Sequence, residues 1–353
     1  MALLALPEPT DRIEPFCPYF GSCGGCTLQH FGPASYMALK QELVGAALRK
    51  THVVAEVAPL IEAHGDGRRR ATLHARGAGV GYMRAHSHDL LDIAACPILV
   101  PALEKRTMAL THPIAATVGD CDVAFTATDT GLDVAVKTER KFKAERLTLL
   151  AQRSGLARMS LNGEIVIESR APTVRMGKAI VELPLASFLQ ATEMAEQVLA
   201  RLVLDGVGSA KSVADLFSGL GPFTLRLAEH ARVFAADSDK AAIAALQKAV
   251  KHTQGLKPVT AVSRDLFREP LVPVELNAYD AVVFDPPRAG AEAQARELAK
   301  SKVKTVVAVS CDPRTFAHDA AILVGGGYRL EKITPVDQFA WSMHVEMVGV
   351  FRR

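Results

Sequence analysis

A cysteine and a glutamate near the C-terminal end of the chain could together carry out covalent chemistry. Cys311 follows an apolar run and precedes Asp312-Pro313-Arg314, so we expect it at the end of a strand, just before a helix. The helix dipole and nearby arginines would lower the pKa of a thiol there and favour a thiolate nucleophile. A lone cysteine is also commonly a small buried apolar residue, and this alternative stays open. Glu346 interrupts a second apolar run, where it is either a desolvated general base or an exposed edge residue.

A uracil ring is a substrate that would need both groups. Its C5 carbon is not nucleophilic enough to accept a methyl group unaided, so a thiolate must first add at C6 and generate an enolate. A base must then remove the C5 proton before the thiolate can leave. Cys311 and Glu346 would supply these two steps.

A glycine-rich turn indicates a cofactor site. The segment Asp215–Phe223 follows a predicted strand and opens a predicted helix, and Gly219 and Gly221 let its backbone turn tightly beside a ligand. Thr224 stands where the dinucleotide fingerprint has its third glycine. This difference favours S-adenosylmethionine over NAD, and an NAD-dependent oxidoreductase is the competing class of enzyme.

Carboxylates follow three further predicted strands. Asp237 and Asp265 could bind the ribose hydroxyls and the adenine amino group of a nucleoside, or they could simply cap the next helices. Asp285-Pro286-Pro287-Arg288 ends the fourth strand, where the two prolines would stiffen the backbone and hold the Asp285 side chain near a methyl donor. Together these residues predict a nucleoside pocket at the carboxyl ends of a parallel sheet.

The elements that must position these residues change character near residue 180. Before it, short β-like runs alternate with turns; after it, apolar strands alternate with amphipathic helices, which predicts an α/β fold with a parallel sheet. The predicted strands are Ser212–Phe217, Arg232–Ala236, Val259–Ser263, Ala281–Phe284 and Thr305–Ser310, closed by a hairpin around Tyr328–Pro335 and Val345–Phe351. The predicted helices are Phe223–His230, Asp239–His252, Ala291–Lys300 and Thr315–Leu323. We expect a Rossmann-like domain with a seven-stranded mixed sheet at 181–353, after a smaller β-rich α+β domain at 1–180.

Two segments are locally basic although the whole chain is nearly neutral. The 353 residues include 41 lysines and arginines against 38 aspartates and glutamates, a net charge of +3 that indicates no particular partner. Residues 137–158 carry seven basic residues against two glutamates. The second segment contains Arg68, Arg69, Arg70, Arg76 and Arg84, interleaved with His64, His74, His86 and His88. Each segment could contact RNA phosphates or form an ordinary solvated surface.

The cysteines and the N-terminal residues indicate the cellular compartment. No signal-like segment opens the chain, and no apolar run approaches the roughly 18 residues of a membrane span. We therefore expect a soluble, cytoplasmic monomer without a membrane partner. Six cysteines in such a chain are not a disulfide framework, and the three within Cys17–Cys26 are typical of a metal site.

With these motifs assembled, the chain resembles the RNA uracil-5-methyltransferase family. The shared motifs occur in family order: Phe188-Leu-Gln190, Asp215–Phe223, Asp285-Pro-Pro-Arg288, Ser310-Cys311-Asp-Pro313 and His344-Val-Glu346. The resemblance implies a class I methyltransferase domain in which Gln190, Phe217, Asp237 and Asp285 contact S-adenosylmethionine. It also implies that Cys311 is the nucleophile and Glu346 the proton acceptor. The family's Phe-Pro-x-Thr stretch is replaced here by Phe339-Ala-Trp-Ser-Met343.

The cysteines resemble those of the iron–sulfur subset of this family. Cys17, Cys23, Cys26 and Cys96 would then hold a 4Fe–4S cluster, although four thiolates suit zinc equally well on chemistry alone. Cys17 stands too early to leave room for the β-barrel that some relatives carry before it. This most resembles the enzymes that methylate 23S rRNA, so we expect RNA, with 23S rRNA favoured over tRNA. A non-catalytic RNA-binding protein of the same fold is the remaining alternative.

Overall fold

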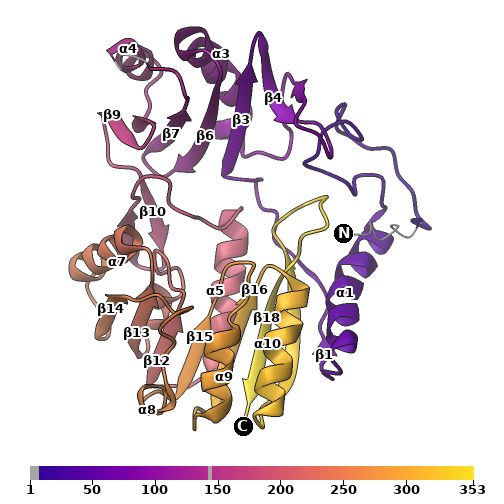
Figure 1. Ribbon diagram of the computed structural model, residues 1–353, viewed down its shortest axis with the longest axis vertical. Helices are drawn as coiled ribbons and strands as arrows, with labels where there is room; N and C mark the ends of the chain where they lie inside the picture. The colour runs from indigo at the N-terminus through magenta and orange to yellow at the C-terminus, as the bar shows by residue number, and fades with distance from the viewer. Residues whose placement is uncertain (1–7, 142–144) are drawn as a thin grey trace.

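The computed structural model describes residues 8–141 and 145–353, and these form an upper and a lower region (Figure 1). The lower region is built on one mixed sheet in the order β1-β17-β18-β16-β15-β12-β13-β14, with β2 also paired to β17. Its main strands are β12 (Ser212–Leu216), β13 (Arg232–Asp237), β14 (Val259–Ser263), β15 (Ala281–Phe284), β16 (Thr305–Ser310), β17 (Arg329–Asp337) and β18 (Glu346–Arg352). These seven strands lie within 181–353 as predicted, but β1 and β2 extend the sheet to nine strands, so the predicted count of seven is wrong.

The lower sheet is parallel in its centre and antiparallel at one side. Strands β14, β13, β12, β15 and β16 run parallel, whereas β18 is antiparallel to β16 and pairs with β17 as the predicted hairpin. The helices of this region are α5 (Glu193–Val207), α6 (Thr224–Leu227), α7 (Lys240–His252), α8 (Pro273–Leu276), α9 (Glu292–Lys300) and α10 (Pro313–Gly325). Separate apolar cores cover the two faces of the sheet, and this double covering explains why the central strands β12, β15 and β16 are buried along their whole length.

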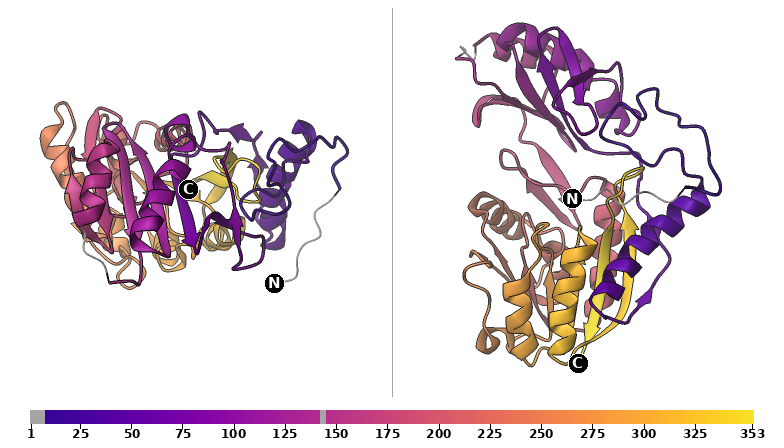
Figure 2. Two further views of the ribbon diagram at one scale, coloured as in Figure 1. Left: turned by 90° about the horizontal axis from the view of Figure 1, so that it is seen from above. Right: turned by 45° about the vertical axis from the view of Figure 1, so that its right-hand side comes forward.

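Residues from the N-terminal part of the chain complete the lower sheet. The short strands β1 (Glu56–Val57) and β2 (Ile61–Glu62) pair with β17, so the hairpin does not form the edge of the sheet. Helix α1 (Pro33–Lys50) packs against α10 and β17, as the right-hand view of Figure 2 shows. Residues 33–62 therefore lie with the lower sheet, although the sequence placed them in the N-terminal domain.

The upper region is β-rich, as predicted. Its antiparallel-dominated sheet has the order β5-β4-β3-β6-β7-β8-β9, and helices α3 and α4 pack beside it. The elements are β3 (Arg70–Arg76), β4 (Gly79–Met83), β5 (Leu90–Asp92), α2 (Pro101–Glu104), α3 (Thr107–Val118), β6 (Cys121–Thr128), β7 (Gly131–Lys137), α4 (Glu145–Arg153), β8 (Arg158–Leu161) and β9 (Glu164–Glu168). A hairpin of β10 (Thr173–Met176) and β11 (Ala179–Glu182) leads into the lower region. None of the described helices is long and apolar enough to cross a membrane.

Candidate active site

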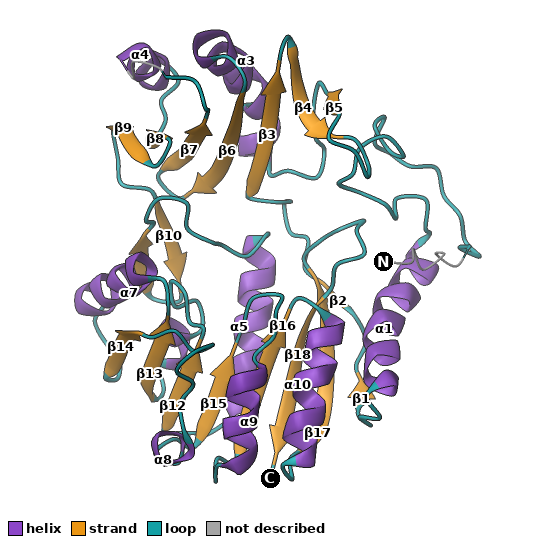
Figure 3. Cartoon of the chain, in the orientation of Figure 1, coloured by secondary structure: helices purple, strands orange, loops and turns teal. Residues whose placement is uncertain are grey.

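The predicted site residues lie at the carboxyl ends of the parallel strands, on the side that faces the upper region. The cartoon in Figure 3 shows the loops that follow β12, β13, β15 and β16 at this edge of the sheet. The glycine turn follows β12, Asp237 ends β13, Asp285 follows β15 and Cys311 follows β16. Because parallel strands end at one edge, residues far apart in the sequence meet there.

The backbone of the glycine turn follows from close packing. Gly221 has a φ of +84°, and a Cβ at this position would lie 2.5 Å from Leu246 Cδ1 on α7. Gly219 also has a positive φ, and its N–H donates to Asp237 Oδ2 at 2.9 Å. Thr224, in place of a third glycine, is fully buried and donates through its hydroxyl to the Asp215 carboxylate. Contacts with Leu246, Asp237 and Asp215 therefore fix the conformation of the turn.

The carboxylate after β13 is not the cap of the next helix. Asp239 caps α7 by accepting hydrogen bonds from the N–H groups of Ala241 and Ala242. Asp237 instead accepts from Gly219 and, through Oδ1, from the N–H of Asp239 at 2.8 Å. The alternative that Asp237 is only a helix cap is thus wrong.

An aromatic pair lies near the carboxylate that follows β14. Asp265 Oδ1 accepts a hydrogen bond from the N–H of Phe267 at 3.1 Å. The Phe267 ring lies 5.3 Å from that of Phe217, which has a left-handed φ of +59°. An exposed Phe267, a partly buried Phe217 and a carboxylate together suit the planar base of a nucleoside.

Two buried oxygen atoms beneath the glycine turn have no hydrogen-bond partner within the described residues. They are Asp215 Oδ1 and Ser218 Oγ. Burial raises the pKa of Asp215 to about 7, so the carboxyl is short of donors. A buried unpaired acceptor is costly, and the hydroxyl and ammonium groups of S-adenosylmethionine are donors of the kind it lacks. The residues at this turn therefore fit that cofactor.

The antiparallel pairing of β16 with β18 brings the predicted nucleophile and base together. Ser310 pairs with Met347, so the next positions outward, Cys311 and Glu346, are neighbours across the ladder. Cys311 is partly exposed, whereas Glu346 is only 4% exposed. The alternatives in which Cys311 is a core residue or Glu346 an exposed edge residue are therefore wrong.

The electrostatic surroundings of Cys311 differ from the prediction. Burial, with the nearby carboxyl groups of Glu346 and Asp285, raises the pKa of the Cys311 thiol to about 11, and the Arg288 guanidinium offsets this only in part. The expected lowering of this pKa by a helix dipole and arginines is thus wrong for the free site. Burial also raises the pKa of Glu346 to about 7 and that of Asp285 well above its usual range. A carboxyl group that titrates near neutral pH is suited to accept and release a proton.

A glutamine that the sequence did not single out joins the candidate base to Gln190. Gln338 is 1% exposed, and its Nε2 donates to Glu346 Oε1 at 2.9 Å and to Gln190 Oε1 at 2.7 Å. Gln190 Nε2 in turn lies 3.5 Å from Asp285 Oδ2. The one sequence feature that could have indicated Gln338 is its polar side chain at the end of an apolar run, next to the Phe339–Met343 stretch.

A buried ion pair holds the loop between β17 and β18. Lys40 of α1 donates to Asp337 Oδ1 at 2.9 Å and to the backbone carbonyl of His344. The Asp337 carboxylate also accepts hydrogen bonds from Tyr36 and from His64, which lies 2.8 Å away. Although burial opposes ionisation, the His64 hydrogen bond and the Lys40 charge keep the pKa of Asp337 below its usual value. The N-terminal helix thus supports the loop that carries Gln338 on one side and Glu346 on the other.

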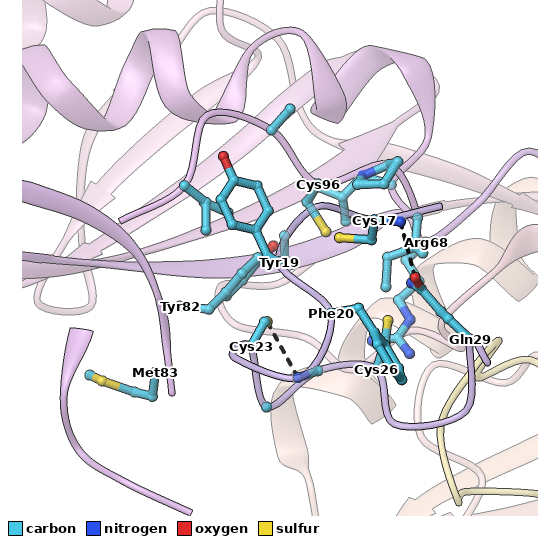
Figure 4. Close-up of a pocket in the computed structure, with 18 of the residues that line it drawn as sticks. Cys17, Tyr19, Phe20, Cys23, Cys26, Gln29, Arg68, Tyr82, Met83 and Cys96 are labelled. Atoms are coloured by element: carbon cyan, nitrogen blue, oxygen red, sulfur yellow. Dashed lines mark hydrogen bonds between the residues drawn. The ribbon is translucent and has the colours of Figure 1, made fainter. Parts of the chain in front are cut away.

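The four predicted metal ligands line one cavity of about 440 Å³ in the upper region (Figure 4). The cysteines are Cys17, Cys23, Cys26 and Cys96, and all are free thiols. Arg68 and Gln29 share this cavity, and the buried Nε of Arg68 and Nε2 of Gln29 find no partner within the described residues. Across residues 8–141 and 145–353, however, no three His, Cys, Asp or Glu side chains are gathered so as to hold a metal ion.

Several of the predicted RNA-binding residues are used inside the protein. Arg158 is 4% exposed and forms two hydrogen bonds to the Asp133 carboxylate, and Arg69 is paired with the buried Glu196. These two arginines are therefore structural, contrary to the prediction. Arg70 differs, because its guanidinium lies 5.6 Å from the ring of Phe188, which is 70% exposed beside Gln190. Residues 142–144 of the basic segment lie outside the described residues.

Comparison with known proteins gives consistent matches. Residues 133–353 match the family model described as tRNA (uracil-5-)-methyltransferase. The chain is 48% identical to an uncharacterized RNA methyltransferase of Brucella suis over 99% of this chain and 87% of that protein. It is 32% identical to the 23S rRNA (uracil(1939)-C(5))-methyltransferase RlmD of Halomonas elongata, over 95% of this chain and 76% of that protein.

A solved structure has the same fold. The tRNA (uracil-54, C5)-methyltransferase of Pyrococcus abyssi, in complex with S-adenosyl-L-homocysteine, matches with a TM-score of 0.76. The match covers 95% of this chain and 86% of that chain at 23% sequence identity. The arrangement of both regions is therefore one that occurs in a solved protein.

Proposed function

Because the chain belongs to the tRNA (uracil-5-)-methyltransferase family and is an S-adenosylmethionine-dependent RNA (uracil-5-)-methyltransferase, we propose that it works through a covalent adduct between Cys311 and its target uridine. The observation that carries this proposal is the β16–β18 register, in which Ser310 pairs with Met347 and Cys311 adjoins Glu346. A nucleophile and a base on adjacent strands can reach the two neighbouring carbons of one pyrimidine ring.

The two residues divide the reaction between them. The Cys311 thiolate adds to C6, and the electron pair displaced from the C5–C6 double bond makes C5 nucleophilic. When bound, S-adenosylmethionine would supply the electrophilic methyl group and a positive sulfonium charge; C5 would take the methyl as its bond to the sulfonium sulfur breaks, which releases S-adenosylhomocysteine. Glu346 then takes the C5 proton, the C5–C6 double bond re-forms, and the thiolate leaves C6. Its pKa near 7 leaves Glu346 partly ionised at neutral pH and able to accept this proton.

The cofactor would lie across the carboxyl edge of the lower sheet. We assign its binding to Gln190, Phe217, Gly219, Gly221, Asp237, Asp265 and Asp285. Support comes from the unpaired buried oxygens beneath the glycine turn and from the Phe217–Phe267 pair beside Asp265. We assign residues 181–353 to methyl transfer and residues 1–180 to RNA binding and the cysteine-lined cavity, with 33–62 as a structural extension of the lower sheet.

We favour a uridine of 23S rRNA as the target, with tRNA as the second candidate. The relative at 32% identity is named for 23S rRNA, whereas the solved structure at 23% identity is named for tRNA, so sequence similarity favours the first. The exposed ring of Phe188, two residues before Gln190, has the Arg70 guanidinium over it and could stack against an unpaired base. Such surfaces suit nucleotides that have left the base stack.

In vitro methylation tests the choice of RNA. With labelled S-adenosylmethionine, we expect the enzyme to methylate an unmodified 23S rRNA transcript at least about tenfold faster than a mixture of tRNA transcripts, because recognition of one RNA loop depends on its shape and unpaired bases. Nuclease digestion should place the label in 5-methyluridine. Faster labelling of tRNA would transfer the proposal to that substrate.

We further propose that Cys17, Cys23, Cys26 and Cys96 hold a 4Fe–4S cluster rather than zinc. Thiolates on a single zinc ion would lie within about 4 Å of one another, given Zn–S bonds of about 2.3 Å. These cysteines instead surround a cavity of about 440 Å³ without converging on one point. A cluster is larger and places each thiolate on a separate iron atom. The unpartnered N–H groups of Arg68 and Gln29 are donors that its sulfur atoms could accept.

Metal analysis of cysteine variants tests this cluster. Protein purified without oxygen should contain about four irons per chain and absorb broadly near roughly 400 nm, as expected for four-thiolate ligation. Cys96→Ser should lose most of the iron and the absorption. Cys121→Ser is the matched control, because Cys121 is buried in β6 away from the cavity, and it should retain both. Colourless wild-type protein with one zinc per chain would refute the cluster.

A further inference from the structure

The orientation of the Gln338 side-chain amide is determined by a backbone group. The N–H of Ala191 donates to Gln338 Oε1 at 2.7 Å. A backbone N–H can only donate, so this contact identifies the oxygen end of the amide. The NH2 end must therefore point the other way, toward Gln190 and Glu346, where it donates one hydrogen bond to each.

This orientation determines which groups Gln190 presents to the site. Its Oε1 is occupied by the Gln338 NH2 group, so the Gln190 NH2 group is directed at Asp285 and the cofactor side. An NH2 group serves acceptors only. The carboxylate at the amino-acid end of S-adenosylmethionine is such an acceptor. An unrestrained amide could flip and present its oxygen instead, which would repel that carboxylate.

The same side chain acts on the candidate base. The Gln338 hydrogen bond favours the ionised form of Glu346, against the effect of burial. The other charged or titratable groups that face Glu346 are Arg288, which also favours its ionised form, and Asp285 and Cys311, whose own titration it affects. Within the described residues, two groups favour the ionised form of Glu346: the uncharged amide of Gln338, through a hydrogen bond, and the charged Arg288.

We propose that Gln338 is a positioning residue that holds the proton acceptor Glu346 and the cofactor-contacting Gln190 in their working orientations through one amide. The inference rests on the proposed covalent mechanism. It deepens that mechanism by linking cofactor binding to proton removal. The neighbouring Asp337, clamped by Lys40, fixes the backbone from which Gln338 projects. Gln338 acts through Gln190 and Glu346, the two side chains to which its amide donates.

The test compares Gln338→Met and Gln338→Glu with wild type. Met removes both donors at similar volume, whereas Glu keeps the shape and the acceptor for Ala191 but places a second carboxylate against Glu346. Single-turnover methylation of the RNA that wild type accepts should be followed from about pH 6 to pH 9.5, a range that spans the Glu346 pKa. For Gln338→Met we expect the rise of rate with pH to move up by about one unit, because the ionised base has lost a donor. The rate at pH 7 should fall about fivefold, because the ionised fraction of Glu346 there drops from about one half to about one tenth, and it should recover at high pH. Gln338→Glu should be slower still at pH 7.

Two further measurements separate positioning from mere packing. Binding of S-adenosylmethionine without RNA should weaken about three- to tenfold in Gln338→Met, because Gln190 has lost the group that orients it. Covalent trapping by 5-fluorouridine RNA at saturating cofactor should persist, because no proton is removed in that adduct. Gln294→Met is the matched control, since Gln294 is equally buried but bonds only the backbone of Leu271, and its pH profile should equal that of wild type.

The outcomes distinguish the inference from the function on which it rests. A lower rate in Gln338→Met with an unshifted pH profile, or a Gln338→Glu variant as active as wild type, would overturn the positioning role. The Gln338→Glu variant preserves the shape of the side chain. If Gln338→Met does not fold, the rate of Gln338→Glu still tests the positioning role. If wild type neither methylates nor is trapped by any uridine RNA, the proposed mechanism itself fails.

Discussion

Replacement of Cys311 by alanine is expected to abolish methyl transfer, with a loss of roughly a thousandfold or more in the single-turnover rate. Without a thiolate at C6, the C5 carbon of uracil remains too weak a nucleophile to take the methyl group. The covalent complex with 5-fluorouridine RNA should disappear as well. The methylation rate is measured by transfer of labelled methyl groups. The covalent complex is measured by gel separation under denaturing conditions.

The structure offers a matched control for this variant. Cys121 is 2% exposed in the core of the upper sheet, so Cys121→Ala should lower stability while leaving adduct formation intact. Cys311 is partly exposed at the end of β16, and its replacement should leave the fold and S-adenosylmethionine binding unchanged. Methylation by Cys311→Ala within tenfold of wild type would show that another group activates the ring.

Local patterns in the sequence were sufficient to predict the centre of the site. Cys311 and Glu346 each adjoin a recognisable apolar strand, and the antiparallel register of β16 and β18 brings them together. The residues around the glycine turn were equally predictable, because the βα turns of a parallel sheet meet at one edge. The sequence did not predict how the charged groups around Cys311 shift its pKa. The pKa of Cys311 depends on its burial and on Glu346 and Asp285, which approach it only in the folded chain.

The residues that form buried ion pairs, such as Lys40, could not be predicted from the sequence for a different physical reason. A lysine in an amphipathic helix is ordinarily solvent-exposed, yet Lys40 is completely buried against a residue 297 positions away. Likewise, Arg158 and Arg69 contributed to basic segments in the sequence but are internal ion-pair partners. A local pattern records charge and hydropathy, whereas pairing depends on which distant elements pack together. The β1 and β2 additions to the lower sheet are a further case, since strands of two residues carry no periodic signal.

The Lys40–Asp337 pair leads to the second large effect, which is on stability. We expect Lys40→Met to lower the free energy of unfolding by about 3–5 kcal/mol, because removal of one partner leaves the other charge buried without compensation. Both side chains have no solvent exposure, and the pair joins α1 to the loop before Glu346. Denaturant unfolding followed by tryptophan fluorescence is a suitable measurement, since Trp341 is the single tryptophan and its backbone N–H donates to the Tyr36 hydroxyl in the same network.

A double variant separates the pair from the general cost of changing α1. In Lys40→Met combined with Asp337→Asn the buried negative charge is gone, so part of the lost stability should return. Arg49→Met on the same helix breaks an exposed pair with Glu42 and should change stability little. If Lys40→Met were no more destabilising than Arg49→Met, the Lys40–Asp337 ion pair would not be needed for the stability of the fold. Since that loop carries Gln338 and ends at Glu346, Lys40→Met should also slow methylation under conditions in which the protein remains folded.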